Sequence, residues 1–111
     1  MNLRDMNWSK AEKAVARCAF ERAYRKECAA IAAKIRKMVA TACEPEGLWR
    51  IHDLLTKERE RTDEKYDYRY SVLVFVFARL LGKRWISEVD LQGLSDDKIE
   101  AIRYLQTGST G

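Results

Sequence analysis

A short stretch of this sequence gathers side chains that could act on another molecule. If the stretch is helical, the spacing i, i+3, i+4, i+7 and i+10 places five of them on one face: Trp49, His52, Asp53, Thr56 and Arg59. An enzyme would use His52 as a general base, with Asp53 as its partner. Adjacent residues of a helix point about 100° apart, so we expect that these two side chains do not pair as a catalytic dyad.

Other signatures of chemistry are missing from the sequence. It has no nucleophile at a recognisable motif, no paired carboxylates and no glycine-rich phosphate loop. The three cysteines, Cys18, Cys28 and Cys43, fit no zinc spacing, and His52 is the only histidine. We therefore expect no enzyme, no metal site and no cofactor.

The face that carries Trp49 also suits the binding of another protein. Trp and Arg residues dominate the energetics of protein interfaces, and a carboxylate that faces a guanidinium forms a directed pair. The alternative is an ordinary amphipathic helix whose polar face happens to contain these residues. The residues alone leave both interpretations open.

Length and charge limit the remaining classes. The 111 residues suffice for one domain, and 34% of them are charged, so dimerisation would add stability to a small core. The 21 basic and 17 acidic residues give a net charge of +4, but the two signs are mixed along most of the sequence. A nucleic-acid-binding face needs a patch of one sign, so we expect no nucleic-acid partner and keep that class as a minor alternative.

Cellular location follows from short apolar runs and from the cysteines. Residues 1–7 lack the apolar core of a signal peptide, and the longest apolar run, 72–78, is far shorter than the roughly 20 residues that span a bilayer. The odd number of cysteines indicates a reduced chain. We expect a cytoplasmic protein without membrane insertion.

Two long helices are predicted in the first half. Ser9 and Glu12 have the spacing of a capping box, and the sequence from there to residue 42 has neither Pro nor Gly, which predicts one helix of about 30 residues. Its apolar residues recur at steps of four and three and form one seam: Tyr24, Cys28, Ile31, Ile35, Met38 and Ala42. Pro45 favours the start of a second helix, which continues through the charged stretch 56–65.

Residues 66–81 allow two interpretations. Their β-favouring side chains alternate, which indicates a strand, but a lone strand would have no sheet to join in an otherwise helical chain. We predict a buried helix over 66–81. After it, Ser87 with Asp90 predicts a short helical turn, Gly93 ends that turn, and Ser95 begins the last helix.

Two blocks of the sequence are distinctive: residues 48–55 read Leu-Trp-Arg-Ile-His-Asp-Leu-Leu, and residues 65–78 read Lys-Tyr-Asp-Tyr-Arg-Tyr-Ser-Val-Leu-Val-Phe-Val-Phe-Ala. Both blocks resemble the fluorescence recovery protein family of cyanobacterial photoprotection. Weaker similarity extends from Trp8 to Lys98. The resemblance implies an all-α homodimer with one domain over 1–107, a long helical stalk over about 9–62 and a small helical head over about 63–106. It also implies that 66–81 is helical, and we expect 108–111 to be a disordered tail or a remnant of cloning.

The resemblance further implies a non-enzymatic regulator that binds photoactivated orange carotenoid protein, or a related carotenoid-binding domain, and speeds its return to the resting form. Three sets of residues match the family's functional positions. The patch near the dimer junction is matched by Trp49, His52, Asp53 and Arg59. The dimer contact is matched by Leu48 and the head contact by Phe75.

The chain departs from the family in its head and just before it. Ala101 stands where a lysine is expected, and Glu64 stands where glycine is usual. The alternative is therefore a helical dimer of the same fold that binds a different protein, in a bacterium without the carotenoid protein.

Overall fold

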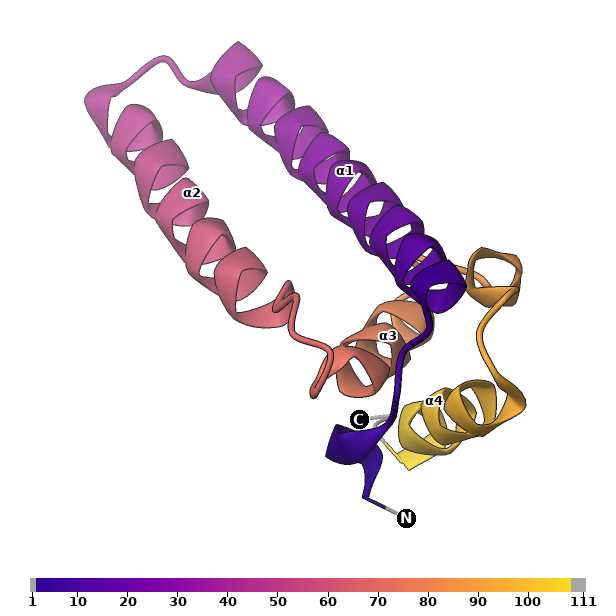
Figure 1. Cartoon of the computed structure of the whole chain (residues 1–111). Coiled ribbons are helices and arrows are strands. Elements are labelled where there is room, and N and C mark those ends of the chain that lie inside the picture. Colours follow the sequence, from indigo (N-terminus) through magenta and orange to yellow (C-terminus); the bar gives the residue numbers. More distant parts are fainter. Residues whose placement is uncertain (1, 109–111) are drawn as a thin grey trace.

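The computed structural model describes residues 2–108, and its regular elements there are all helices, apart from one isolated bridge between Gln92 and Leu94. In chain order the elements are η1 (Leu3–Asp5), α1 (Lys10–Thr41), α2 (Pro45–Lys65), α3 (Leu73–Gly82), η2 (Glu88–Leu91) and α4 (Asp96–Gly108). Figure 1 shows α1 and α2 side by side as an antiparallel hairpin, here called the stalk. The elements from α3 onward gather at the N-terminal end of α1 and form the head. The all-α prediction is confirmed for the described residues.

The tail prediction is only partly accessible to the structure. Gly108 is the last residue of α4, so the prediction that the tail begins there is wrong for that residue. The rest of the predicted tail, 109–111, lies outside the described residues.

The start of α1 follows the predicted capping box. The Glu12 backbone N–H donates to Ser9 Oγ at 3.1 Å, and the Ser9 N–H donates back to Glu12 Oε1 at 3.0 Å. These two bonds satisfy backbone donors that the first helical turn leaves without partners. At the far end of the stalk, Pro45 occupies the first turn of α2, where its fixed φ angle suits a helix start.

The predicted helix over 66–81 is wrong for its first part. Residues 66–69 have no regular structure, 70–72 form a turn, and α3 starts only at Leu73. The rings of Tyr66 and Tyr68 both pack edge-on against Phe20 of α1, at 5.4 and 4.8 Å between centroids. Arg69 pairs with Asp67, with Nε 2.8 Å from the nearer carboxylate oxygen. Tyr66 and Tyr68 therefore pack on α1 without forming a strand or a helix, and the later part of the segment forms α3.

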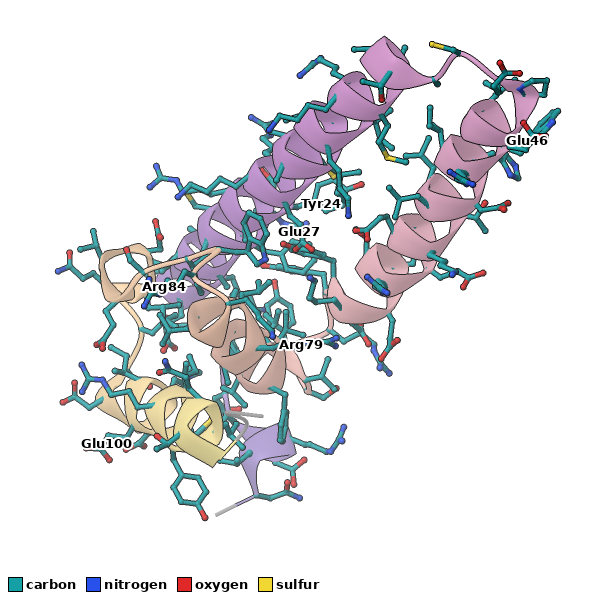
Figure 2. All side chains as sticks on the ribbon, turned by 180° about the vertical axis from the view of Figure 1, so that it is seen from behind. Tyr24, Glu27, Glu46, Arg79, Arg84 and Glu100 are labelled. Atoms are coloured by element: carbon teal, nitrogen blue, oxygen red, sulfur yellow. The ribbon has the colours of Figure 1, made fainter. Side chains whose placement is uncertain are left out.

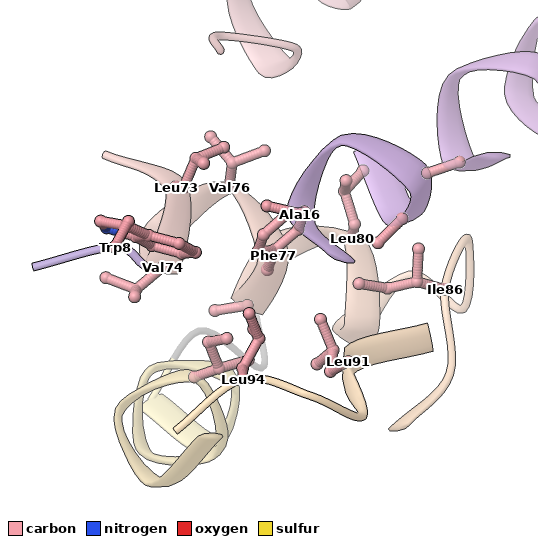
Figure 3. Packing of buried hydrophobic residues seen from close by; sticks show 14 residues of the cluster. Trp8, Ala16, Leu73, Val74, Val76, Phe77, Leu80, Ile86, Leu91 and Leu94 are labelled. Atoms are coloured by element: carbon pink, nitrogen blue, oxygen red, sulfur yellow. The ribbon is translucent and has the colours of Figure 1, made fainter. Parts of the chain in front are cut away.

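The hydrophobic core lies in the head (Figure 3). It joins the first turns of α1 to α3, η2 and α4, and its fully buried large side chains are Phe77, Leu73, Leu80, Leu91, Ile102 and Val74. Gly93 lets η2 approach α1: its φ is +106°, and an added Cβ would lie only 2.8 Å from Val15 Cγ2. Any larger residue at this position would be strained twice over, by its backbone angle and by contact.

A buried carboxylate, that of Glu12, joins α1 to α4. Glu12 Oε2 accepts from Lys98 Nζ at 3.0 Å and from the Ser95 N–H at 2.9 Å, and Lys98 is itself buried. Burial alone would raise the pKa of the Glu12 carboxyl. The hydrogen bonds from Ser9 and Ser95, together with Lys98, outweigh burial and lower this pKa to about 2.

A second buried carboxylate, that of Glu27, joins α1 to the end of α2. It pairs with Lys65, whose side chain is also almost completely buried, and it accepts a hydrogen bond of 2.8 Å from the Tyr66 hydroxyl. Burial, and then this bond to Glu27, raise the pKa of Tyr66 above its usual value. The stalk is thus fastened where it meets the head.

The Glu12 network predicts a loss of stability in acid. The carboxyl titrates at its usual 4.5 in the unfolded chain and at about 2 in the folded one, so its contribution is complete above pH 4.5 and is lost as the pH falls toward 2. The contribution amounts to about 3 kcal/mol. Urea unfolding at several pH values between 7 and 2 should show this decline in the free energy of unfolding.

The variant Glu12→Gln tests the assignment. It should lower the free energy of unfolding at pH 7 by about 3 to 5 kcal/mol, because Lys98 is left buried without an anion, and it should flatten the decline in acid. The matched control Glu21→Gln removes an exposed carboxylate from the same helix and should behave like the unmodified protein. An acid decline in Glu12→Gln as steep as in the unmodified protein would contradict the assignment.

Candidate protein-binding site on α2

The predicted patch lies on the exposed side of α2. Ile51 and Thr62 of this helix are buried, whereas Trp49 is 60% exposed. The Trp49 and His52 rings meet edge to face with their centroids 6.3 Å apart. We call Trp49, His52, Asp53 and Arg59 the Trp49 patch. All four side chains are exposed, so the patch is open to a partner.

We predicted that His52 and Asp53 do not pair as a catalytic dyad, and the structure shows a contact between them that is long and exposed. Their Nδ1 and Oδ1 atoms lie 3.4 Å apart, because side-chain rotation brings the tips together although the residues leave the helix in different directions. The two side chains are 69% and 75% exposed, so water competes for both groups and the contact is weak.

Arg59 is held by a carboxylate that the sequence interpretation overlooked. Its Nε lies 3.0 and 3.2 Å from the two carboxylate oxygens of Asp63, one helical turn further on. Asp53 does not take part. The i, i+4 spacing of Arg59 and Asp63 was the available signal, since such residues are neighbours on a helix surface. Thr56 is occupied by the helix itself, because its hydroxyl donates to the His52 carbonyl at 3.0 Å.

Apolar side chains are exposed along the stalk. Leu48 is 57% exposed, and Val39 and Leu55 are also exposed. Between the two helices runs an open groove of about 160 Å³. It is lined by Tyr24, Cys28, Ile31, Leu55, Glu58, Arg59 and Thr62. The first three residues of the predicted α1 seam, Tyr24, Cys28 and Ile31, therefore face α2. The groove is open, so α2 of the same chain covers this part of the seam only partly.

Phe75 does not belong to the Trp49 patch. It lies on α3 in the head, is half-buried against the core, and has the guanidinium of Arg4 5.4 Å from the centre of its ring. The patch lies on the stalk (Figure 1). A partner that touches both would have to extend along the molecule.

Residues 2–108 contain neither a candidate metal site nor a candidate membrane-spanning helix. No three or more His, Cys, Asp or Glu side chains gather closely enough to hold a metal ion. None of the helices combines the length and apolar character needed to cross a membrane.

The exposure of the patch predicts that it contributes little to folding. Arg59→Ala should change the free energy of unfolding by less than about 1 kcal/mol, because an exposed ion pair such as Arg59 with Asp63 contributes little. The control Lys65→Ala, on the same helix, should cost about 3 to 5 kcal/mol by leaving Glu27 buried and unpaired. Urea unfolding measures both. An equal loss in the two variants would show that Arg59 supports the fold.

Comparison with known proteins places these features in a family. The profile of the photoprotection regulator fluorescence recovery protein family matches residues 8–106. The fluorescence recovery protein of Synechocystis sp. PCC 6803 is 36% identical over 98 residues, which make up 88% of this chain and 90% of that protein. Two solved structures agree with the fold. That of the Fremyella diplosiphon protein has 42% identity and a TM-score of 0.85, and that of the Synechocystis protein has 35% identity and a TM-score of 0.86. Each alignment covers 91% of this chain and 99% of the other. The chain therefore belongs to the photoprotection regulator fluorescence recovery protein family.

Proposed function

We propose that this photoprotection regulator binds photoactivated orange carotenoid protein and accelerates its return to the resting orange form, which ends energy quenching. The observation that carries the proposal is the exposed Trp49 in a patch of polar neighbours on a protein of this family. A large aromatic side chain beside an arginine is the composition of an interface hot spot. No covalent step is required, which agrees with a non-enzymatic role.

The physical mechanism is differential binding. A protein that binds the transition state between the active and resting forms more tightly than the active form lowers the barrier to return. Its affinity for the resting product must be weaker, so that it is released. The Trp49 patch would supply this affinity from the stalk and Phe75 a second contact from the head.

We further propose that the working unit is a homodimer in the cytoplasm. Leu48, with its side chain exposed at the distal part of the stalk, would be the central dimer contact. Its neighbour Trp49 would then lie at the edge of the junction, where it could reach a partner. The three cysteines, all free, fit the reducing cytoplasm.

The alternative is a dimer of the same fold with another protein partner. Two positions favour it: Ala101 is half-buried on α4 beside the exposed Glu100, and Glu64 lies 3.9 Å from Arg79. With Ala101 in place of the expected lysine and the acidic Glu100 beside it, a head contact that relies on this lysine would be weaker. The assay below distinguishes the two functions.

The activity test follows the red-to-orange return of photoactivated orange carotenoid protein by absorbance. The unmodified protein should accelerate the return. Trp49→Ala and Phe75→Ala should each lower the acceleration about tenfold or more, as loss of a hot-spot residue lowers affinity. The control Tyr104→Ala removes an aromatic side chain that is 77% exposed elsewhere on the head, and it should retain the activity. No acceleration by a folded, dimeric protein would reject this partner and favour the alternative.

The dimer test replaces Leu48 by Glu. The substitution would put an unpaired charge into the proposed contact, at a cost of several kcal/mol, and light scattering during gel filtration should report the monomer mass. The control Val89→Glu changes an apolar residue of η2 that is also exposed, and it should leave the mass of the dimer unchanged. A dimer mass for Leu48→Glu would place the interface elsewhere.

A further inference from the structure

The fold separates charges that are mixed in the sequence. The acidic residues of α1 are Glu12, Glu21 and Glu27. Two of them, Glu12 and Glu27, are buried and paired with Lys98 and Lys65, so only Glu21 offers an exposed negative charge on this helix. The basic residues of α1 are all exposed. The exposed charges of α1 are therefore nine positive and one negative.

The positive charge gathers on the side of α1 that faces away from α2. At about 100° per residue, this side lies opposite Tyr24, Cys28 and Ile31, which line the groove to α2. Nitrogen-tipped side chains project from it along the outer edge of the stalk (Figure 2). Its basic members are Arg22, Arg25, Lys26, Arg36 and Lys37, and with Lys34 at its flank they are here called the basic face. Between Lys26 and Lys37 the other side chains on this side are small: Ala29, Ala30 and Ala33.

Most charges of the basic face are not neutralised within the described residues. Arg22 pairs with Asp90 of η2 at 2.9 Å. The other five have no ion pair to any residue of 2–108, and no acidic residue occurs between Glu27 and Glu44. Glu21 lines one hollow with Arg22, Arg25 and Lys26, and apart from this carboxylate the five unpaired cations form a surface of one sign.

The composition of the basic face decides which polyanion fits it. Protein interfaces depend on large apolar or aromatic anchors, and helices that lie on membranes need an apolar side of Leu, Phe or Trp. Neither kind of residue is present between Arg22 and Lys37 on this side. A phosphodiester backbone needs no anchor, because its binding is driven by release of counterions from the phosphates. The alanines leave room for such a backbone to approach the helix.

We propose that the basic face binds nucleic acid through its phosphates, without sequence preference. From Arg22 to Lys37 the helix rises by roughly 22 Å, the length of about six phosphates along one DNA strand. The activity is additional to regulation of a carotenoid protein, because the basic face and the Trp49 patch are on different helices. Both partners could be bound at once.

The test is fluorescence anisotropy with a labelled 20-base-pair duplex of mixed sequence, titrated at several NaCl concentrations. Five phosphate contacts predict that the logarithm of the affinity falls with the logarithm of the salt concentration with a slope of about −4 to −5. Changing Lys34, Arg36 and Lys37 to Gln should weaken binding at least tenfold at 0.1 M salt and reduce the slope by about 3. A matched control changes Lys57, Arg61 and Lys83 to Gln, with the same loss of net charge, and should bind within about twofold of the unmodified protein.

Three outcomes would overturn the proposal. The first is no binding of the duplex at 50 mM salt. The second is an equal loss in the two triple variants, which would show that net charge rather than the basic face attracts the DNA. The third is competition by poly-glutamate as strong as by DNA of equal charge, which would identify the face as a site for acidic protein segments. Circular dichroism before each titration establishes that the variants are folded.

Discussion

The carboxylates of Glu12 and Glu27 are both removed from water, and each needs a cation from a distant part of the chain. Lys98 comes from α4 and closes the head on the start of α1, while Lys65 is the last residue of α2 and closes the stalk. An uncompensated buried charge costs several kcal/mol, so loss of either lysine would destabilise the folded chain. The direction in which α2 leaves the head, and with it the placing of the Trp49 patch, depends on Lys65.

The same two pairs determine what the protein shows to its surroundings. They bury two of the three negative charges of α1 and leave its positive ones exposed, so the back of the stalk is basic while α2 presents a mixed surface with Trp49. The head contributes the hydrophobic core and carries Phe75 at its edge. Rigid helices thus hold separate surfaces in fixed relative positions, as a protein that acts by binding requires.

Local signals in the sequence were sufficient for the helices and insufficient for what joins them. The Ser9 capping box, Pro45 and the long run without glycine act within a few residues, so they predicted α1 and α2 correctly. Residues 66–72 depend instead on distant contacts, because Tyr66 and Tyr68 pack against Phe20. Their side-chain pattern indicated a strand and we predicted a helix, but they form a connection without regular structure. The ion pair of Glu27 and Lys65 spans 38 positions, and no local pattern indicates it. The sequence also indicated the residues of the Trp49 patch, but it did not lead us to Asp63 as the partner of Arg59.

The most direct measurement of whether the Trp49 patch receives a partner is fluorine NMR of protein labelled with 5-fluorotryptophan. The three tryptophans give separate reporters: Trp49 on the exposed patch, Trp8 in the core and Trp85 near the end of α3. Addition of photoactivated orange carotenoid protein should shift or broaden the Trp49 signal and leave that of Trp8 unchanged. An unchanged Trp49 signal, under conditions where the two proteins are shown to bind, would contradict a function for this patch.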